Sequence, residues 1–303
     1  CASEKCRRLL DYCRSISLLR WLVSCAIARL HRVRVSSFNL HRDLEGGGGV
    51  IGIAIFQMEL FVEASNHSSA LSLNLHRGAQ VNQLSLSTAS GKRLDVIDSF
   101  KPEEDFFGSG SFLMFPWVNR LAAREVNIDG RTVAFDPPMS DSTGHSIHGL
   151  VFDKPRRVVD SSNTHIHLTL AESPADFPSV SELWRLEERA LVVKYTFTNE
   201  SAVTQKFAFG LHPYFSLGTK VDTWIIQTNM THFHPLTHEL LPGDEPPQPI
   251  SQVFSQTEPL GATSLDHTLT DPVDGPPTLS IIDAAQQVKL TVTGLPPISP
   301  DSI

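Results

Sequence analysis

From residue 50 onward, short apolar runs alternate with turn-forming residues, and this pattern predicts β-strands. The clearest run is Leu191–Thr198, LVVKYTFT, which is closed by the turn-forming Asn199–Ser201. Its β-branched and aromatic residues favour a strand. The same reasoning predicts further strands at Ile51–Phe56, Leu71–Leu75, Val81–Leu86, Val126–Ile128, Val133–Phe135, His165–Leu170, Lys206–Gly210, Thr223–Thr228, Thr278–Ile282 and Val288–Val292.

A β-hairpin is predicted at Val126–Phe135, because Asp129-Gly130 supplies its two-residue turn. Asn119-Arg120 precedes this hairpin and His148-Gly149 follows it. A rigid hairpin flanked in this way can hold an arginine and a histidine over one cleft.

The fold class follows from the number of strands. No run of helical period comparable to these strands occurs after residue 50, and no repeat of fixed period is present. Many short strands at nearly regular spacing indicate an all-β sandwich or barrel. The proline-rich stretch Leu241–Ile250 is typical of a surface loop.

Residues 1–50 differ in texture from the rest of the chain. Ile16–Leu30 is apolar but contains Arg20 and Arg29, and it is shorter than the ~20 residues that a membrane span needs. It could be an import signal, but we favour a poorly ordered helical extension, joined to the body by the flexible run Gly46–Gly49. The predicted organisation is an extension over 1–50 and one β-domain over 51–303.

Charge and cysteine content narrow the function classes. Residues 1–43 hold nine Lys/Arg against three Asp/Glu, so the net charge of −8 for the whole chain leaves −14 on the remainder. An acidic body argues against a nucleic-acid surface and suits a neutral small ligand. All four cysteines precede residue 26, whereas a disulfide-built secreted domain would spread them through its fold. We therefore expect a cytoplasmic protein that needs neither disulfides nor a metal.

Other candidate motifs are weak. The histidine groups, His145 with His148 and a second group over 232–238, lack a carboxylate or thiolate complement for a metal. Gly108–Ser111 lacks the G-x-S-x-G spacing of a serine hydrolase. The run Gly46–Gly49 is not followed by the Lys-Ser/Thr of a phosphate-binding loop.

Several segments, which occur in the family's order, resemble the aldose 1-epimerase (galactose mutarotase) family from about Leu71 to about Val292. They are Leu73–Val81 (LNLHRGAQV), Phe115–Arg120 (FPWVNR), Ile147–Leu150 (IHGL), Gly210–Phe215 (GLHPYF) and Leu265–His267 (LDH). The resemblance implies a galactose mutarotase-like supersandwich, which is a large antiparallel β-sandwich. It also implies interconversion of the α and β anomers of a free aldohexose, without a cofactor.

Mutarotation needs a proton delivered to the ring oxygen and another removed from the C1 hydroxyl. A general acid and a general base each contribute ~10²–10⁴-fold, and histidine titrates close enough to neutrality to serve. By resemblance, the catalytic residues are His212 as the acid and His148 as a hydrogen-bond donor to the sugar. The implied sugar-binding residues are Asn119, Arg120, Tyr214 and Asp266, while Trp117 and Phe215 could offer apolar faces.

Plain structural roles remain open for each of these residues. His212 could simply pack at a strand end, Arg120 could form a loop salt bridge, and Asn119 could cap a turn. Asp266 could be an ordinary surface aspartate, and aromatic residues in such strands usually belong to the core.

The chain departs from the family at its C-terminal end. The family's base is a glutamate on a strand beyond the Leu-Asp segment, but no glutamate follows Glu258 in this sequence. We expect a shortened or mis-spliced sequence, and loss of catalysis is the other interpretation. The alternative functions are a non-catalytic carbohydrate-binding protein and a glucose-6-phosphate 1-epimerase, although scattered Lys/Arg residues give little support for a phosphate site. The expected partner is a small aldose rather than nucleic acid or membrane, and the oligomeric state cannot be predicted.

Overall fold

The computed structural model describes residues 33–40, 56–99, 106–128, 130–134, 136–137 and 139–294. Within these residues the regular structure is β-strand, with three short 3-10 helices and no α-helix. No helix in the described part of the chain is long and apolar enough to cross a membrane. The described residues form two compact units: unit 1 takes those within 1–118, 127–133 and 149–215, and unit 2 takes those within 119–126, 134–148 and 216–303.

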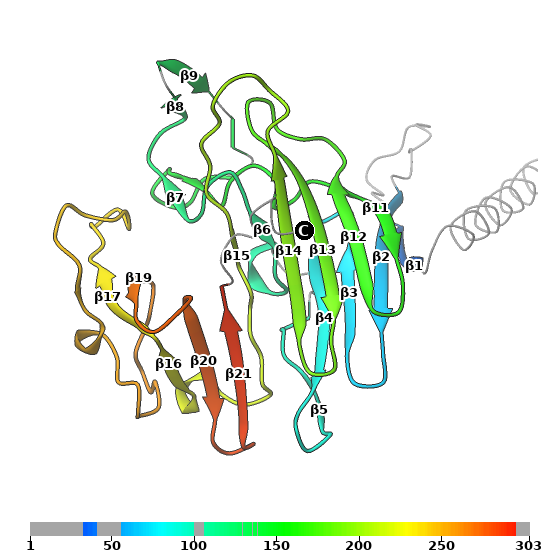
Figure 1. Cartoon of the computed structure of the whole chain (residues 1–303), viewed down its shortest axis with the longest axis vertical. Helices are drawn as coiled ribbons and strands as arrows, with labels where there is room; N and C mark the ends of the chain where they lie inside the picture. The colour runs from blue at the N-terminus through cyan, green and yellow to red at the C-terminus, as the bar shows by residue number, and fades with distance from the viewer. Residues whose placement is uncertain are drawn as a thin grey trace, which may run out of the picture. The chain divides into compact units, whose positions relative to one another are not determined.

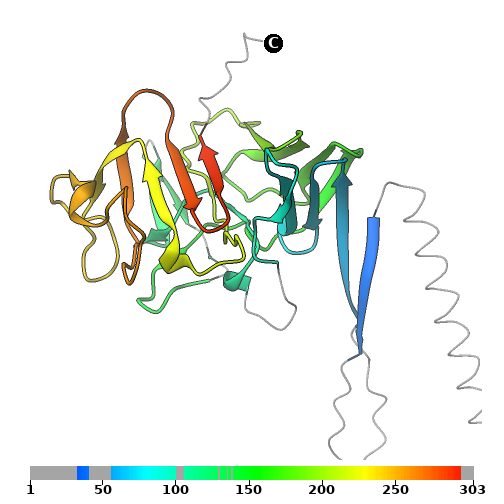
Figure 2. The ribbon, with the colours of Figure 1, turned by 90° about the horizontal axis from the view of Figure 1, so that it is seen from below.

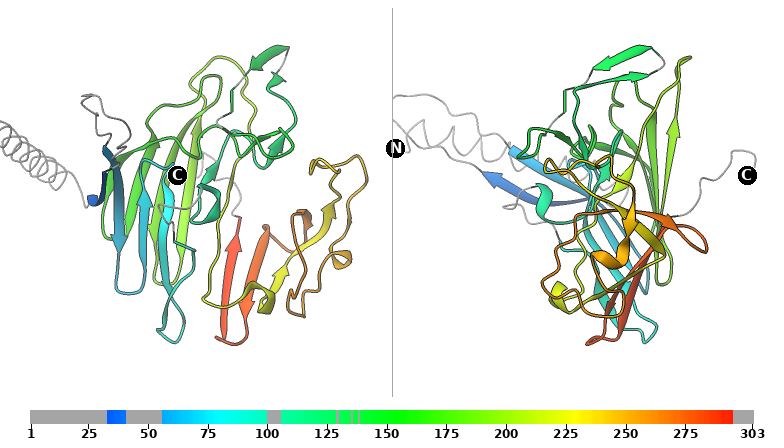
Figure 3. Two further views of the ribbon diagram at one scale, coloured as in Figure 1. Left: turned by 180° about the vertical axis from the view of Figure 1, so that it is seen from behind. Right: turned by 90° about the vertical axis from the view of Figure 1, so that its left-hand side faces the viewer.

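Two antiparallel sheets build unit 1 (Figure 1). The five-stranded sheet has the order β1-β2-β3-β4-β5 and the four-stranded sheet has the order β11-β12-β13-β14. In the view from behind, β2 to β5 lie in front of β11 to β14 (Figure 3), and β12 contacts β2. Their bounds are β1 Val33–Leu40, β2 Phe56–Ser65, β3 Ala70–Asn74, β4 Gln80–Ser87, β5 Arg93–Asp95, β11 Arg156–Ser161, β12 His165–Leu170, β13 Ser179–Leu186 and β14 Leu191–Thr198.

Alternation of side chains along these strands produces the core of unit 1. Along β12, Ile166, Leu168 and Leu170 are buried while the intervening positions are partly exposed. β3 contributes the buried Leu71 and Leu73 from the other sheet. Successive strand side chains point to opposite faces, so each sheet buries one apolar face in the sandwich.

A charged pair also lies in this core. The side chains of Arg156 on β11 and Glu182 on β13 are 0% and 1% exposed, with 2.6 Å between Nε and Oε1. Trp184 Nε1 donates to the other carboxylate oxygen at 3.0 Å, and Arg156 Nη1 donates to the carbonyl oxygens of Val151 and Lys154. Tyr195 stands opposite Glu182 in the β13–β14 ladder, and its buried hydroxyl has no hydrogen-bond partner among the described residues.

Shorter elements connect the sheets of unit 1. β6 (Leu113–Met114) pairs with β15 (Gly210–Leu211), and the 3-10 helix η1 spans Phe106–Gly108. The hairpin of β8 (Glu125–Ile128) and β9 (Arg131–Ala134) has residues in both units and confirms the hairpin predicted from the sequence.

Unit 2 contains three small antiparallel sheets. β16 (Ile225–Thr228), β20 (Thr278–Asp283) and β21 (Val288–Thr293) lie side by side (Figures 1 and 2). β17 (Met230–His234) lies between β18 (Gln248–Pro249) and β19 (Thr268–Pro272), and β7 (Arg120–Leu121) pairs with β10 (Ser146–Ile147). The 3-10 helices η2 (Val221–Thr223) and η3 (Ile250–Gln252) complete the unit.

The predicted all-β sandwich is confirmed, and two strands, β12 and β14, have the predicted bounds. The strand predicted at Lys206–Gly210 is wrong, because only Gly210 and Leu211 pair, with β6. Ala208 N–H donates to the carbonyl of Pro116 at 2.8 Å, but a proline has no N–H to donate in return. The ladder therefore cannot extend to the earlier residues. β16 begins at Ile225 rather than Thr223, after η2.

The predicted extension contributes one described element. β1 lies within residues 1–50 and pairs with β2. Strand pairing therefore begins before residue 50, and the domain boundary at that residue stays a prediction. The apolar run 16–30, the glycine run and all four cysteines lie outside the described residues. So do the first five residues of the strand predicted at Ile51–Phe56, whose last residue begins β2.

Candidate active site

The predicted Asn-Arg and His-Gly loops lie next to each other in unit 2. In the β7–β10 ladder Arg120 pairs with Ile147, and His148 N–H donates to the carbonyl of Asn119 at 2.9 Å. Asn119 and His148 both have left-handed backbones, with φ of 54° and 63°. Non-glycine residues adopt this conformation uncommonly, and such strain concentrates at functional sites.

Gly149 explains the second half of the His-Gly motif. Its φ is +85°, and a Cβ there would lie 2.2 Å from the carbonyl oxygen of Phe115. Leu150 N–H donates to that same oxygen at 2.7 Å. Only glycine allows so close an approach of two backbone segments, so the motif fixes where the chain leaves His148.

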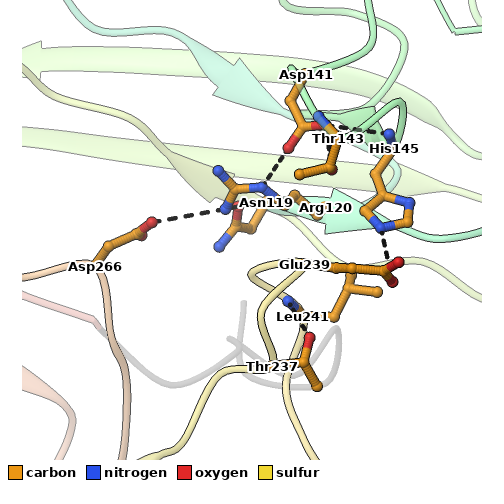
Figure 4. A network of polar contacts seen from close by, with 9 residues as sticks. All are labelled: Asn119, Arg120, Asp141, Thr143, His145, Thr237, Glu239, Leu241 and Asp266. Carbon is orange, nitrogen blue, oxygen red and sulfur yellow. Dashed lines mark hydrogen bonds and ion pairs between the residues drawn. The ribbon is translucent and has the colours of Figure 1, made fainter.

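Arg120 is the centre of a polar network (Figure 4). Its Nε donates to Asp141 Oδ2 at 2.6 Å, and its Nη1 donates to Asn119 Oδ1 at 3.1 Å. Asp266 lies on its other side, with its carboxylate oxygen 3.7 Å from Nη1. The Arg120 side chain is 13% exposed, whereas that of Asp266 is 62% exposed. The guanidinium is therefore held from within the protein and flanked by an accessible carboxylate.

Two hydrogen-bond donors of this network are not used within the described residues. No described group accepts from Arg120 Nη2 or from Asn119 Nδ2. Both are planar nitrogen donors suited to a hydroxyl oxygen. Together with the Asp266 carboxylate they form a set of donors and an acceptor.

Asp141 accepts four hydrogen bonds. Besides Arg120, Thr143 donates through its hydroxyl at 2.6 Å and through its backbone N–H at 2.9 Å, and the His145 backbone N–H donates at 3.1 Å. Burial alone would raise the pKa of the Asp141 carboxyl, but the bonds from Thr143, Arg120 and His145 outweigh it. They hold this pKa well below its ordinary value, so the carboxylate stays charged at neutral pH.

His145 extends the network to a third acidic residue. Its Nε2 lies 3.4 Å from a carboxylate oxygen of Glu239, whose side chain is half exposed. The sequence singles out His145 only as a metal-ligand candidate, and it singles out neither Asp141 nor Glu239. The stretch Asp141–Gly144 has the composition of a side-chain-stabilised turn, and this was the available signal for Asp141. Nothing local identifies Glu239.

His212 and Tyr214 belong to unit 1. His212 follows β15, and its N–H donates to the carbonyl of Phe112 at 3.0 Å. Its ring stacks on that of Phe112, with centroids 4.9 Å apart and an interplanar angle of 11°. The ring of Tyr214 lies 4.9 Å away on a tilted plane, and burial raises the pKa of its hydroxyl. The imidazole is therefore fixed by aromatic contacts and is itself partly exposed.

The structure thus groups Asn119, Arg120, His148 and Asp266 in unit 2, and His212 with Tyr214 in unit 1. His148 is buried, as is Trp117, which occupies a core position. Among the described residues, no group of three or more His, Cys, Asp or Glu side chains is placed to hold a metal ion.

Residues 62–298 match the aldose 1-epimerase family. The chain belongs to the aldose 1-epimerase family. No curated protein matches it significantly. Among solved structures it is similar to a putative aldose 1-epimerase from Escherichia coli K12, with 19% identity, a TM-score of 0.60, and 75% of this chain and 74% of that chain covered.

Two further solved structures share the fold. A GalM/aldose epimerase homologue from C. elegans is 15% identical with a TM-score of 0.62, and the match covers 77% of this chain and 78% of that chain. A galactose 1-epimerase from Lactobacillus acidophilus NCFM is 16% identical with a TM-score of 0.54, covering 84% of this chain and 77% of that chain. At these identities the likeness establishes the mutarotase-like fold of this family member.

Proposed function

We propose that the protein interconverts the α and β anomers of free aldohexoses such as glucose or galactose, by acid–base ring opening and without a cofactor. The observation that carries the proposal is the set of unused groups around Arg120. Asn119 Nδ2 and Arg120 Nη2 can donate to sugar hydroxyl oxygens, and the exposed Asp266 carboxylate can accept from a hydroxyl. A sugar hydroxyl both donates and accepts, so it needs partners of both kinds.

The acid–base roles follow from the chemistry of ring opening. His212 is the proposed general acid that protonates the ring oxygen, and its stacking on Phe112 would hold the imidazole in one orientation. His148 is the proposed hydrogen-bond donor to the sugar, and Tyr214 a proposed binding residue. The C1 hydroxyl proton needs a base, and Asp266 and Glu239 are the exposed carboxylates of the Arg120 network.

Charge supports a neutral rather than a phosphorylated sugar. The network contains three carboxylates, those of Asp141, Glu239 and Asp266, against the single guanidinium of Arg120. A dianionic phosphate would be repelled by this excess of negative charge. Glucose 6-phosphate is therefore a poor fit to the network, and a free aldose fits it.

Polarimetry tests the proposal directly. Freshly dissolved α-D-galactose and α-D-glucose should mutarotate faster with the purified protein than in buffer alone. His212→Ala should lower the enzymatic rate by about 10²–10⁴-fold, and Arg120→Ala should weaken it strongly. Arg124→Ala is the matched control, because the Arg124 side chain is 62% exposed and, within the described residues, its ion pair is with an exposed aspartate. It should behave like the wild type.

Each contrary outcome has a meaning. A folded wild-type protein that leaves both sugars at the buffer rate overturns the proposal. If calorimetry then shows saturable binding of galactose, the non-catalytic carbohydrate-binding alternative holds. Acceleration with glucose 6-phosphate alone would favour the phosphosugar alternative. Asp266→Asn and Glu239→Gln, measured in parallel, would identify the base in an active enzyme.

A further inference from the structure

We propose that Asp141 is a positioning residue, which orients the Arg120 guanidinium so that its Nη2 and the neighbouring Asn119 Nδ2 face the sugar. The proposal rests on the function proposed above. The family resemblance does not include Asp141, and its assignment rests on the contacts of the Arg120 network.

The bond to Nε decides which nitrogens remain for a ligand. Asp141 Oδ2 accepts a hydrogen bond from Arg120 Nε at 2.6 Å, and Asn119 Oδ1 accepts one from Arg120 Nη1 at 3.1 Å. A guanidinium is planar, so fixing two of its nitrogens fixes the direction of the third. A flexible arginine side chain would otherwise sample several orientations, and each productive encounter with a sugar would have to select one.

Asp141 can impose this orientation because it is itself immobilised. Its Oδ1 accepts from the Thr143 hydroxyl, the Thr143 N–H and the His145 N–H, and its own N–H donates to the His145 carbonyl at 3.0 Å. Its side chain is only 10% exposed. Because hydrogen bonds keep the pKa of this carboxyl well below its ordinary value, it remains a charged partner for Arg120 at neutral pH.

The loop that carries Asp141 is tied to the strand that carries Arg120. Ser140 forms an isolated bridge with Ser146, and β10 then pairs with β7, so that Ile147 lies opposite Arg120. The two residues therefore share one small backbone framework as well as a side-chain bond. A change in the Asp141 carboxylate is passed to the guanidinium rather than absorbed by a free loop.

A purely structural role for Asp141, as a staple of its own turn, makes a different prediction. The variant Asp141→Asn distinguishes the structural role from the positioning role. Its amide oxygen can still accept from Thr143 and His145, whereas its amide nitrogen replaces the oxygen that accepts from Arg120 Nε. Thr143→Ala is the matched control, since it removes one bond of the turn and leaves the arginine bond intact.

The experiment is steady-state mutarotation of α-D-galactose, with thermal unfolding of each variant. The positioning role predicts that Asp141→Asn lowers kcat/KM by about 10–100-fold, mainly through KM, as expected for the loss of one charge-assisted bond. Its Tm should stay near that of Thr143→Ala. Thr143→Ala should keep wild-type kinetics, because the backbone N–H groups of residues 143 and 145 still hold the Asp141 carboxylate. Asp141→Glu keeps the carboxylate and should recover part of the loss. A purely structural role predicts instead that Asp141→Asn and Thr143→Ala lower the Tm to a similar extent, without a specific effect of Asp141→Asn on KM.

A second readout does not depend on activity. In the wild type, the ¹H–¹⁵N resonance of Arg120 Nε, assigned with Arg120→Lys, should be shifted downfield and protected from solvent exchange, and Asp141→Asn should abolish both properties. An unchanged resonance overturns the proposal. An active wild type with an equally active Asp141→Asn overturns it while the epimerase function stands, whereas an inactive but folded wild type overturns the function itself. If Asp141→Asn does not fold, KM is measured instead for Asp141→Glu and Arg120→Lys. The positioning role predicts a raised KM for both variants, and a wild-type KM in both overturns it.

Discussion

Replacing Glu182 with glutamine should destabilise unit 1 far more than a similar change at its surface. The substitution keeps the size of the side chain but removes the negative charge that faces Arg156 in the core. Arg156 then remains charged at 0% exposure, because a guanidinium does not lose its proton in proteins. One of its nitrogens, Nη2, already lacks a hydrogen-bond partner among the described residues.

The magnitude follows from what the pair loses. Breaking a buried ion pair by removing one partner costs about 3–5 kcal/mol. Arg156 Nε and Trp184 Nε1 donate to different carboxylate oxygens, and glutamine replaces one of these acceptors with an amide NH2 group, which adds about 1 kcal/mol. The sum is about 4–6 kcal/mol, and at about 2–4 °C per kcal/mol for a chain of this size the expected loss in Tm is roughly 8–24 °C.

The assay is urea and thermal unfolding followed by circular dichroism. Glu187→Gln is the control, because Glu187 pairs with Arg185 at 3.1 Å near the same strand but both side chains are about half exposed. It should change stability by less than about 1 kcal/mol. The double variant Arg156→Met/Glu182→Leu replaces both charges with apolar groups and should lose less than the two single changes added together. The reasoning is refuted if Glu182→Gln costs no more than Glu187→Gln, or if the double variant shows full additivity.

Two further predictions concern the same unit. Burial, aided by the charge of Glu182 and opposed by Arg156, raises the pKa of Tyr195 well above its usual range. The folded protein therefore keeps this hydroxyl neutral while the unfolded chain ionises it, so stability should fall as pH rises above about 10. Tyr195→Phe should show a smaller alkaline loss of denaturation midpoint, and equal losses would contradict the assignment. Gly78→Ala should be severely destabilising, because its Cβ would lie 1.7 Å from the Phe152 carbonyl oxygen. Gly91→Ala shares the positive φ but meets no atom within 4 Å, so it should cost only about 1 kcal/mol in the same thermal scan.

Strands could be predicted from the sequence where their inward-facing residues are apolar. Leu191–Thr198 and His165–Leu170 were predicted with the bounds that the structure has, because their composition alone is that of a strand. Ser179–Leu186 was missed, although it alternates as regularly, because Glu182 occupies one of its inward positions. Its partner Arg156 lies on a different strand, and local pattern contains no information about such a distant pairing.

The candidate site shows the same division. Asn119-Arg120 and His148-Gly149 could be placed together because each flanks a predicted hairpin, and the β7–β10 ladder does bring them side by side. The role of Asp141 could not be foreseen, since its turn composition predicts a loop but not which side chain the loop would contact. Glu239 reaches the network from a segment about 90 residues further along the chain, and only the fold shows this.

The interleaving of the two units has a consequence for dissecting the protein. Two of the points where the chain passes from one unit to the other fall at 118/119 and 148/149, and another follows residue 215. The first two points lie within the Phe115–Arg120 and Ile147–Leu150 segments, and the third lies at the end of the Gly210–Phe215 segment. A fragment ending at 215 would therefore retain unit 1 together with two orphaned pieces of unit 2, and no single cut yields either unit alone. The residues assigned to sugar chemistry lie at or next to points where the chain passes between the two units. Proteolytic cleavage there should therefore abolish both the activity and the folded structure.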